Sequence, residues 1–590
     1  MALTLREDYL LSAAIDFGTT YCGVMFSLRK DFEEGNRLRI WGNQQDNKGD
    51  MNSLQEPTTV LLDPERKFLS FGVEAEDKYK NFALKSAHRE HYYFRHFKMT
   101  LHRQIELTLY TELEDINGKK HRAIAIFTMA IRFLKERLLQ NIKRREFSYI
   151  GEHEIRWVLT VPAMWSEKAK QYMREAAKEA GIPYNQLAIA LEPEVAAVYC
   201  KELSIQRKEA QMLATFDPKS RYMVLDLGGG TGDVTLQEVQ DDGTLQEFWC
   251  AEGGDWGGVG IDKEFYDLLE KLLGKDVFEK FKYEHTYEWI SMQEEFEQNK
   301  KKIKSSGTDQ NELIVTLPIQ LLKLHNTMIE SSLGDVMKTT QFKDQIELVQ
   351  ENKLILKDSI VSHFFEKTLK TITDHVQSIF NNTETTGVDT VVLVGGFADS
   401  DVVQHRIKKD FHTKKVIIPS EAGKAVLKGA VIFGHNPQAI SARISPCTYG
   451  LHTQKPYSSV YPSDRKSIVD GKAVVRNVFD KHIEIGEIVY ISKPKKRQTF
   501  YVIDNTKAEV FWNVYRSTKK DPLLCDDPSC VQIGVLRVHV DPDKSEKRRE
   551  LGVCLICRGT ELEAEAVDKN TGKLYHATFD FLQRSGEIYH

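Results

Sequence analysis

Residues 11–28 read LSAAIDFGTTYCGVMFSL, which is two apolar runs joined by a short turn of small residues. Apolar, β-branched runs around a glycine turn predict a β-hairpin. Asp16 stands at the end of the first run, and Gly18, Thr19 and Thr20 form the turn. A lone carboxylate at the mouth of a buried strand, followed by glycine and hydroxyl groups, suits a metal ion bound to a phosphate.

The same outline recurs at residues 222–239, which read YMVLDLGGGTGDVTLQEV. Asp226 takes the place of Asp16, and the turn that follows is Gly228-Gly229-Gly230-Thr231. Because the two copies lie 210 residues apart, the repeat indicates a duplicated domain rather than a solenoid. We expect the two turns to face each other across a cleft.

These residue types predict a phosphate and magnesium site. Glycine turns let backbone N–H groups approach an anion, and threonine hydroxyls add further donors. Asp16 and Asp226 supply carboxylate oxygens, which suit Mg²⁺ together with its waters, and Asp233 is a third candidate ligand.

A third glycine element lies at residues 390–409, TVVLVGGFADSDVVQHRIKK. It predicts a buried strand, a Gly395-Gly396 turn, and a helix whose start carries the capping pattern Asp401-x-x-Gln404. Ribose or adenine would fit against bare backbone at such a turn, although an ordinary strand-to-helix connection has the same pattern.

Composition excludes several classes of protein. The 590 residues are 41% hydrophobic and 28% charged, which predicts two to four globular domains. A net charge of -5 argues against nucleic-acid binding. We expect a cytoplasmic protein, because the N-terminus lacks the pattern of a secretory signal and no run resembles a membrane span.

Other polar clusters have plainer interpretations. Cys525-x4-Cys530 and Cys554-x2-Cys557 have the spacing of zinc ligands, but the second pair lies in a predicted strand, where residues three apart point to opposite faces. His91, His96 and the basic run 493–497 are expected at a solvated surface rather than in a metal site or a nuclear-import signal.

In order and spacing, the three glycine elements resemble the ATPase domain of the 70-kilodalton heat-shock chaperones, within the actin, hexokinase and heat-shock ATPase superfamily. The resemblance covers about residues 10–435. Smaller matches lie at residues 160–182, 191–199 and 253–265, and the divergent twelfth-member branch fits best through residues 91–102, 421–437 and 511–522.

The resemblance implies an α/β fold with two duplicated actin-like lobes around a nucleotide cleft, at residues 10–190 and 191–440. Residues 441–590 alternate between polar and apolar in short runs, which predicts a β-rich domain. Its last segment, 561–581, resembles the family's substrate-binding β-sandwich. We expect no helical lid after it, and the acidic, leucine-rich linker typical of the family does not precede it.

The resemblance also implies ATP or ADP with Mg²⁺ as cofactors and assigns a role to each matching residue. Asp16, Asp226 and Asp233 would organise Mg²⁺ through water. Lys98 would be the catalytic lysine, with Glu192 and Pro162 near the attacking water. The nucleotide would be held by Gly18, Thr19, Thr20, Tyr21, Gly228, Gly229, Gly230, Thr231, Glu297, Lys300, Lys301, Gly395, Gly396 and Phe397, and catalysis would use Lys98, Asp226, Glu192, Thr231 and Asp233.

Three positions depart from the family's pattern. Phe397 and Asp399 replace a serine and an adenine-packing arginine, and Gly423 replaces an acidic ribose contact. The phosphate side is therefore complete, and the adenosine side is altered.

We expect a slow Mg²⁺-dependent ATPase whose nucleotide state governs protein or peptide binding by the β-domain, as in a stress-response chaperone. One alternative is an ATP-binding adaptor with little or no hydrolysis, and another is a small-molecule kinase of the superfamily. Expected partners are protein clients or signalling proteins and a nucleotide-exchange partner, but no nucleic acid. The chain is expected to be a monomer.

Overall fold

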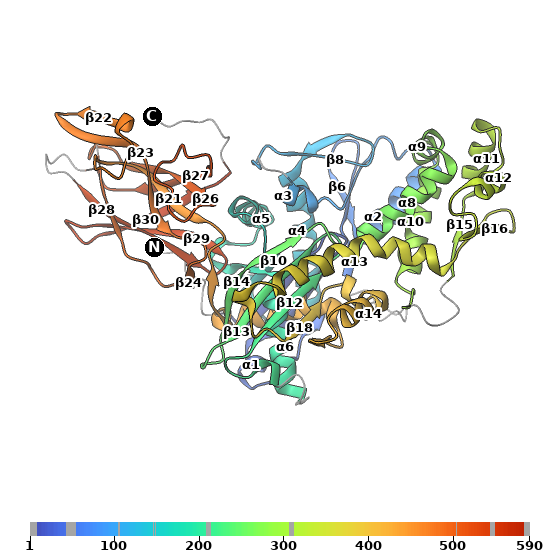
Figure 1. Ribbon diagram of the computed structural model, residues 1–590, viewed down its shortest axis with the longest axis horizontal. Helices are drawn as coiled ribbons and strands as arrows, with labels where there is room; N and C mark the ends of the chain where they lie inside the picture. Colours follow the sequence, from blue (N-terminus) through green and yellow to red (C-terminus); the bar gives the residue numbers. More distant parts are fainter. Residues whose placement is uncertain are drawn as a thin grey trace.

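The computed structural model describes residues 9–42, 55–103, 107–145, 147, 149–207, 214–305, 312–502, 504–542 and 549–582 (Figure 1). Two α/β lobes form the body of the molecule. A domain of β-strands, coloured orange to red, lies at one end of the long axis, and helices α9, α11 and α12 lie at the other (Figure 1).

The first lobe is built on a sheet in the order β11-β10-β1-β2-β3, with β4 also paired to β2. The predicted hairpin is confirmed, because β1 and β2 are antiparallel from Leu11↔Leu28 to Phe17↔Cys22. β1 and β10 are mostly apolar and are buried along nearly their whole length because both faces of this sheet are covered. The strands are β1 (Leu11–Phe17), β2 (Tyr21–Leu28), β3 (Trp41–Gly42), β4 (Gln55–Pro57), β10 (Ile155–Val161) and β11 (Leu187–Leu191).

The second lobe repeats this arrangement, with a sheet in the order β19-β18-β12-β13-β14-β20-β24. In each lobe the hairpin's first strand pairs in parallel with a strand that returns after a long excursion, β10 in the first lobe and β18 in the second. The predicted second hairpin is thus also confirmed. The strands are β12 (Arg221–Leu227), β13 (Gly232–Val239), β14 (Leu245–Gly254), β18 (Thr390–Val394), β19 (Lys415–Ile417), β20 (Ile440–Ile444) and β24 (Ile488–Tyr490).

Two helices, α6 (Glu192–Arg207) and α15 (Ala425–His435), pack between the two sheets. They share one apolar cluster with residues of both sheets, including Val158 and Val224. The helices approach closely because residue 429 is glycine: a Cβ there would lie 1.7 Å from the Val195 carbonyl oxygen. This crossing joins the lobes at the base of the cleft.

Each lobe also carries a smaller outer part. In the first, it holds β5 (Thr59–Leu62), β6 (Phe68–Phe71), β7 (Tyr92–Arg95), β8 (Glu112–Glu114), β9 (Lys120–Arg122), α2 (Gly72–Leu84) and α3 (Met99–Arg103). In the second, it holds α9 (Lys275–Glu284), α10 (Thr286–Lys300), α11 (Ile319–Met328), α12 (Leu333–Thr339), β15 (Leu313–Thr316), β16 (Ile346–Val349) and β17 (Lys353–Leu356). The remaining helices are α1 (Arg29–Glu33), α4 (Ala123–Arg144), α5 (Glu167–Glu179), α8 (Val259–Leu273), α13 (Asp358–Phe380) and α14 (Asp401–Asp410).

The C-terminal part forms an antiparallel sheet in the order β22-β23-β21-β26-β27-β30-β29-β28-β25. Buried and more exposed residues alternate along β29, which explains the polar and apolar alternation of its sequence. The strands are β21 (Thr448–Pro456), β22 (Lys466–Val469), β23 (Lys472–Ile483), β25 (Gln498–Tyr501), β26 (Glu509–Ser517), β27 (Cys530–His539), β28 (Glu550–Arg558), β29 (Glu561–Asp568) and β30 (Leu574–Asp580).

Spatial units in this molecule do not follow continuous segments of the chain. α15 packs on the first lobe's strands β1 and β10, although it follows the second lobe in sequence. β24 belongs to the second lobe's sheet, although it lies within the β-rich segment. In the described ranges, no helix is both long enough and apolar enough to cross a membrane.

Candidate functional site

Three carboxylates, two of them buried and that of Asp16 half-buried, lie at the ends of the two hairpins. Asp16 is in β1, Asp226 is in β12, and Asp233 lies directly opposite Asp226 on β13. In the first hairpin, the residue opposite Asp16 is Gly23, so the second hairpin alone carries an acidic pair. The Thr160 hydroxyl donates to Asp16 at 2.7 Å, and the Ala163 amide donates to Asp233 at 3.1 Å.

The two predicted turns meet across the cleft. A Cβ placed on Gly229 would lie 2.2 Å from Thr20 Oγ1, and one on Gly230 would lie 2.6 Å from Thr19 Oγ1. The threonines of one turn therefore fill space that exists only because the other turn lacks side chains. The expectation that the turns face each other is confirmed.

A second glycine loop holds the turn of residues 228–230 in place. The amides of Gly257, Gly258 and Val259 donate to the carbonyls of Gly230, Gly228 and Gly229 at 3.2, 3.2 and 2.9 Å. Gly257 must lack a side chain because a Cβ there would lie 2.3 Å from the Gly229 carbonyl oxygen.

The predicted catalytic lysine lies among these acids. Lys98 Nζ is 2.6 Å from Glu192 Oε1, and it lies 5.5 Å from the centre of the Trp165 ring. The side chain of Lys98 is almost completely buried. Burial alone would lower the pKa of Lys98, but the charges of Glu192 and Asp16 outweigh it and raise this pKa.

Burial and mutual repulsion also raise the pKa values of the three aspartates. Burial, followed by the charge of Glu192, raises the pKa of Asp16 to about 6 and that of Asp233 to about 7. The pKa of Asp226 is raised further by burial, Glu192 and the facing Asp233. Buried anions of this kind are stabilised by a cation, which would lower their pKa values again.

The donor set fits Mg²⁺ bound through water. Oxygen ligands around an open turn are what this ion prefers, and it commonly keeps several waters. Among the described residues, no group of three or more His, Cys, Asp or Glu side chains could hold a metal directly. The roles of Asp16, Asp226 and Asp233 as outer ligands therefore stay predictions.

The predicted adenosine-binding residues form one ionic cluster at the end of α10. Lys300 is 2.5 Å from Glu297 and 2.6 Å from Asp262. Lys301 is 3.2 Å from Glu297 and donates across the cleft to the Tyr21 hydroxyl at 3.1 Å. Tyr21 of the first lobe and Lys301 of the second thus bridge the mouth of the cleft.

The third glycine element lies beside Asp226. Gly395 has a φ of +93°, and a Cβ on it would lie 2.4 Å from Asp226 Oδ1. Gly396 has open space around it, since a Cβ there would meet nothing within 4 Å. Phe397 is only 7% exposed and stacks on Phe365 in the second lobe's core.

Two departures from the family pattern compensate each other. Asp399 accepts a hydrogen bond from the Gly423 amide at 3.3 Å, and a Cβ on Gly423 would lie 2.4 Å from Asp399 Oδ2.

The predicted capping pattern at Asp401 is wrong. Ser400 is the N-cap residue, and Gln404 donates to the Ala398 carbonyl, because a short turn of 3-10 helix precedes α14.

Sequence reasoning missed Thr160, Trp165 and Glu194. Thr160 and Trp165 flank the Val-Pro-Ala segment, so their proximity to that matched segment was an available signal. Glu194 follows Glu192 by two residues at the start of α6 and forms a two-bond ion pair with Arg443, at 2.5 and 2.7 Å. Nothing local indicated that partner, which lies 249 residues away.

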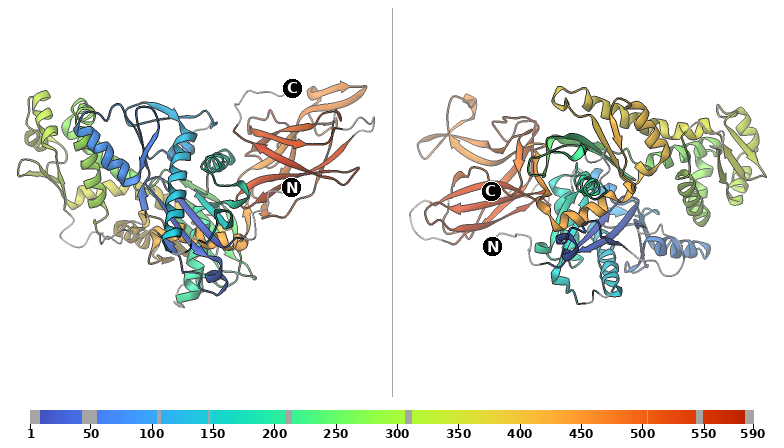
Figure 2. Two further views of the ribbon diagram at one scale, coloured as in Figure 1. Left: turned by 180° about the vertical axis from the view of Figure 1, so that it is seen from behind. Right: turned by 90° about the horizontal axis from the view of Figure 1, so that it is seen from below.

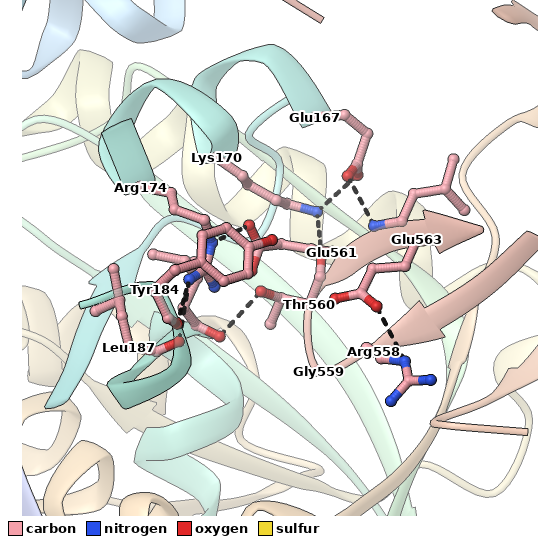
Figure 3. Close-up of polar contacts among 12 residues, drawn as sticks. Glu167, Lys170, Arg174, Tyr184, Leu187, Arg558, Gly559, Thr560, Glu561 and Glu563 are labelled. Atoms are coloured by element: carbon pink, nitrogen blue, oxygen red, sulfur yellow. Dashed lines mark hydrogen bonds and ion pairs between the residues drawn. The ribbon is translucent and has the colours of Figure 1, made fainter. Parts of the chain in front are cut away.

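The β-domain is joined to the first lobe by α5 (Figure 3). Arg174 on α5 forms a two-bond ion pair with Glu561, and Lys170 donates to the Thr560 carbonyl at 2.9 Å. The Thr560 hydroxyl donates to the Ile189 carbonyl of β11 at 2.9 Å. Arg443 also donates to the Gly559 carbonyl, so the turn between β28 and β29 contacts both lobes.

The two lobes, the facing phosphate turns and the buried lysine define an actin-like ATPase domain. A family model described as Hsp70 protein matches residues 128–454. Heat shock 70 kDa protein 12A of Mus musculus is 31% identical over 630 residues, covering 98% of this chain and 92% of the relative. Heat shock 70 kDa protein 12B of Homo sapiens is 30% identical over 643 residues, with the same coverage.

The chain therefore belongs to the Hsp70 family. Within that family, it falls in the divergent branch that contains the heat shock 70 kDa proteins 12A and 12B, as its sequence predicted.

Proposed function

We propose that the cleft binds Mg²⁺-ATP and hydrolyses it slowly, and that nucleotide state governs how the β-domain is held. One observation carries the proposal: Thr19 and Thr20 interdigitate with Gly229 and Gly230 beside three aspartates and the buried Lys98. Phosphoryl transfer needs chiefly positioning and neutralisation of charge, and this arrangement supplies groups for both.

Each group has a role that follows from its surroundings. The hydroxyls of Thr19 and Thr20 would be donors for phosphate oxygens, and the glycine turn would admit the phosphates close to the backbone. The Thr231 hydroxyl hydrogen-bonds to Asp233 and would fix that carboxylate. Lys98 would direct its charge at the terminal phosphate, with Glu192 fixing its position at 2.6 Å. Magnesium, when bound, would supply charge neutralisation for the phosphates.

A short chain of ion pairs and hydrogen bonds through the first turn of α6 supports coupling to the β-domain. Glu192 contacts Lys98, while Glu194, two residues along the first turn of α6, contacts Arg443. Arg443 in turn donates to Gly559, at the β28–β29 turn. A shift of Glu192 on hydrolysis would therefore move the residue that holds Arg443, and coupling would follow if this chain of contacts has two alternative arrangements.

The test is single-turnover hydrolysis of ATP labelled at the γ-phosphate, with binding measured by calorimetry in the same samples. Lys98→Ala should reduce hydrolysis by about 100-fold or more, as expected for loss of a group that stabilises the transition state, and should retain nucleotide binding. Lys367→Ala is the matched control, because Lys367 is exposed and forms a surface ion pair with Glu264.

Binding without turnover in the wild-type protein would favour an ATP-binding adaptor. That alternative has a specific observation behind it, because Phe397 is packed in the core and Asp399 is engaged with Gly423, so the adenosine side differs from the family's pattern. No binding of ATP or ADP would overturn both versions of the proposal.

A further inference from the structure

A methionine sulfur lies where the two predicted phosphate turns meet. Met99 is the first residue of α3 and follows Lys98 directly. Its Sδ accepts a hydrogen bond from the Thr19 hydroxyl at 3.6 Å. A Cβ placed on Gly230 would lie 2.6 Å from the same sulfur atom. The thioether therefore contacts the threonine of one turn and uses space that the glycine of the other turn leaves open.

The backbone before α3 explains why Lys98 and Met99 reach the same site. His96 has a φ of +52°, in the left-handed region that a residue with a side chain seldom adopts. The Met99 amide donates to the His96 carbonyl at 3.4 Å, which closes a tight turn. From this turn, the Lys98 side chain reaches Glu192 and the Met99 side chain reaches Thr19. One turn thus positions both the predicted catalytic lysine and the sulfur atom.

This part of the cleft is open to solvent. Met99 is half-buried, and so are Thr20, Gly229 and Gly230 of the two turns. Met223, in β12 of the second lobe, is by contrast fully buried. Because the sulfur of Met99 is not sealed in a core, a small oxidant such as hydrogen peroxide has access to it.

Oxidation of this sulfur would change both of its contacts. Hydrogen peroxide transfers one oxygen atom to the thioether: the sulfur loses two electrons, an S–O bond forms, the O–O bond breaks and water leaves. A thioether is a weak acceptor, whereas the polar sulfoxide oxygen would hold the Thr19 hydroxyl more firmly. The added oxygen also needs room where the sulfur is packed closely against Gly230. Both changes act on the turns that are predicted to receive the phosphates.

We infer that Met99 is a site of reversible oxidation that controls nucleotide binding. In the thioether form, the Thr19 hydroxyl can exchange its weak sulfur acceptor for a phosphate oxygen. In the sulfoxide form, the hydroxyl is retained by the sulfoxide and the two turns no longer fit closely. Enzymes that reduce methionine sulfoxide would restore the first form. The inference rests on the proposed function, because it concerns access of phosphate to the same turns.

The test compares ADP binding by calorimetry before and after treatment with hydrogen peroxide, while peptide mass spectrometry follows oxidation at each methionine. In the wild-type protein, complete oxidation of Met99 should raise the dissociation constant for ADP about tenfold or more, because a hydrogen bond to a charged phosphate is lost. In Met99→Leu, the same treatment should not change that variant's own dissociation constant. Both proteins contain the same eight cysteines, so thiol oxidation affects them equally.

Met129→Leu is the matched control. Met129 is also half-buried, but it lies on α4 and packs against the core of the first lobe. Oxidation should therefore weaken ADP binding by this variant as much as it does in the wild type. Met328 is 42% exposed, and its conversion to the sulfoxide shows that the oxidant is active.

A measurement without nucleotide separates this inference from the proposed function. Oxidation should lower the midpoint of urea unfolding more in the wild type than in Met99→Leu, because the added oxygen overpacks the space between the turns. If the untreated wild type binds no ADP, the proposed function fails, and equal shifts of the two midpoints would then overturn the inference as well.

Two results would overturn the inference while leaving the proposed function intact. One is that Met99 stays unmodified under conditions that oxidise Met328. The other is that the wild-type protein with fully oxidised Met99 binds ADP as tightly as the untreated protein does.

Discussion

The hairpin β1–β2 and its repeat β12–β13 differ in the residues that follow their first strands. The first turn carries Thr19 and Thr20, and the second carries Gly229 and Gly230 at the same positions of the repeat. Each glycine lies where a Cβ would collide with a threonine of the other turn. The two copies have become complementary: one supplies hydroxyl groups and the other supplies the space and the bare backbone beside them.

The strands differ as well. Asp16 faces Gly23 across its hairpin, whereas Asp226 faces Asp233. The carboxylates are therefore concentrated on the second hairpin, and the outer part of the first lobe contributes the neighbouring cation, because Lys98 follows β7.

The largest effect, complete loss of nucleotide binding, is expected from breaking the complementarity of the turns. Gly229→Thr should abolish measurable ADP binding and lower the free energy of unfolding by about 1–3 kcal/mol, because an added side chain overpacks against Thr20. The double variant Thr20→Gly with Gly229→Thr exchanges the two residues and should restore part of the ADP binding and part of the unfolding free energy. Calorimetry measures the binding, and urea unfolding measures the stability.

Gly334→Ala serves as the control for that experiment. Its Cβ would lie 3.9 Å from Ser332 Oγ, an ordinary contact on α12. If the exchanged pair binds ADP no better than Gly229→Thr alone, the turns are not complementary in the proposed sense.

The second prediction concerns pH. The pKa of Asp233 is raised from 3.8 to about 7, so the folded state holds this proton more tightly than the unfolded state does. Stability should therefore fall as pH rises from about 4 to 7. Asp233→Asn removes this titrating group. At pH 8 the free energy of unfolding of this variant should exceed that of the wild type by up to about 4 kcal/mol.

Asp16→Asn gives the comparison for the first hairpin. The pKa of Asp16 is raised only to about 6, so Asp16→Asn should gain less unfolding free energy at pH 8 than Asp233→Asn does. Urea unfolding at pH 4.5 and pH 8 without Mg²⁺ measures both. A larger gain for Asp16→Asn than for Asp233→Asn would contradict the concentration of charge on the second hairpin.

The smallest effects are expected at the next position of each turn, Tyr21 and Thr231. Thr231 is 6% exposed, and its hydroxyl hydrogen-bonds to Asp233, so Thr231→Val should cost about 1–2 kcal/mol of unfolding free energy. Tyr21→Phe removes only the acceptor of Lys301, whose side chain is 56% exposed, and should cost less than about 1 kcal/mol. Thermal unfolding at pH 7 compares the two variants, and a larger loss of stability for Tyr21→Phe than for Thr231→Val would contradict the prediction.

The sequence alone indicated the α/β class, both hairpins, the facing turns and the family, because these depend on local patterns. A glycine turn after an apolar strand has the same meaning wherever it occurs, and duplication made the pattern visible twice. It also placed Lys98 and Glu192 in one site through the resemblance to the family.

Only the tertiary structure could reveal the pairings between distant segments. Arg443 meets Glu194 and Gly559, and α15 returns to the first lobe. No local pattern indicates these contacts, because they join residues more than 100 positions apart. Asp399 and Gly423 are a second example. In the sequence they are two separate departures from the family's pattern, whereas in the structure the Gly423 amide donates to the Asp399 carboxylate. Local pattern fixes which strands and turns form. Burial and charge, which depend on what packs against them, decide which side chains act together.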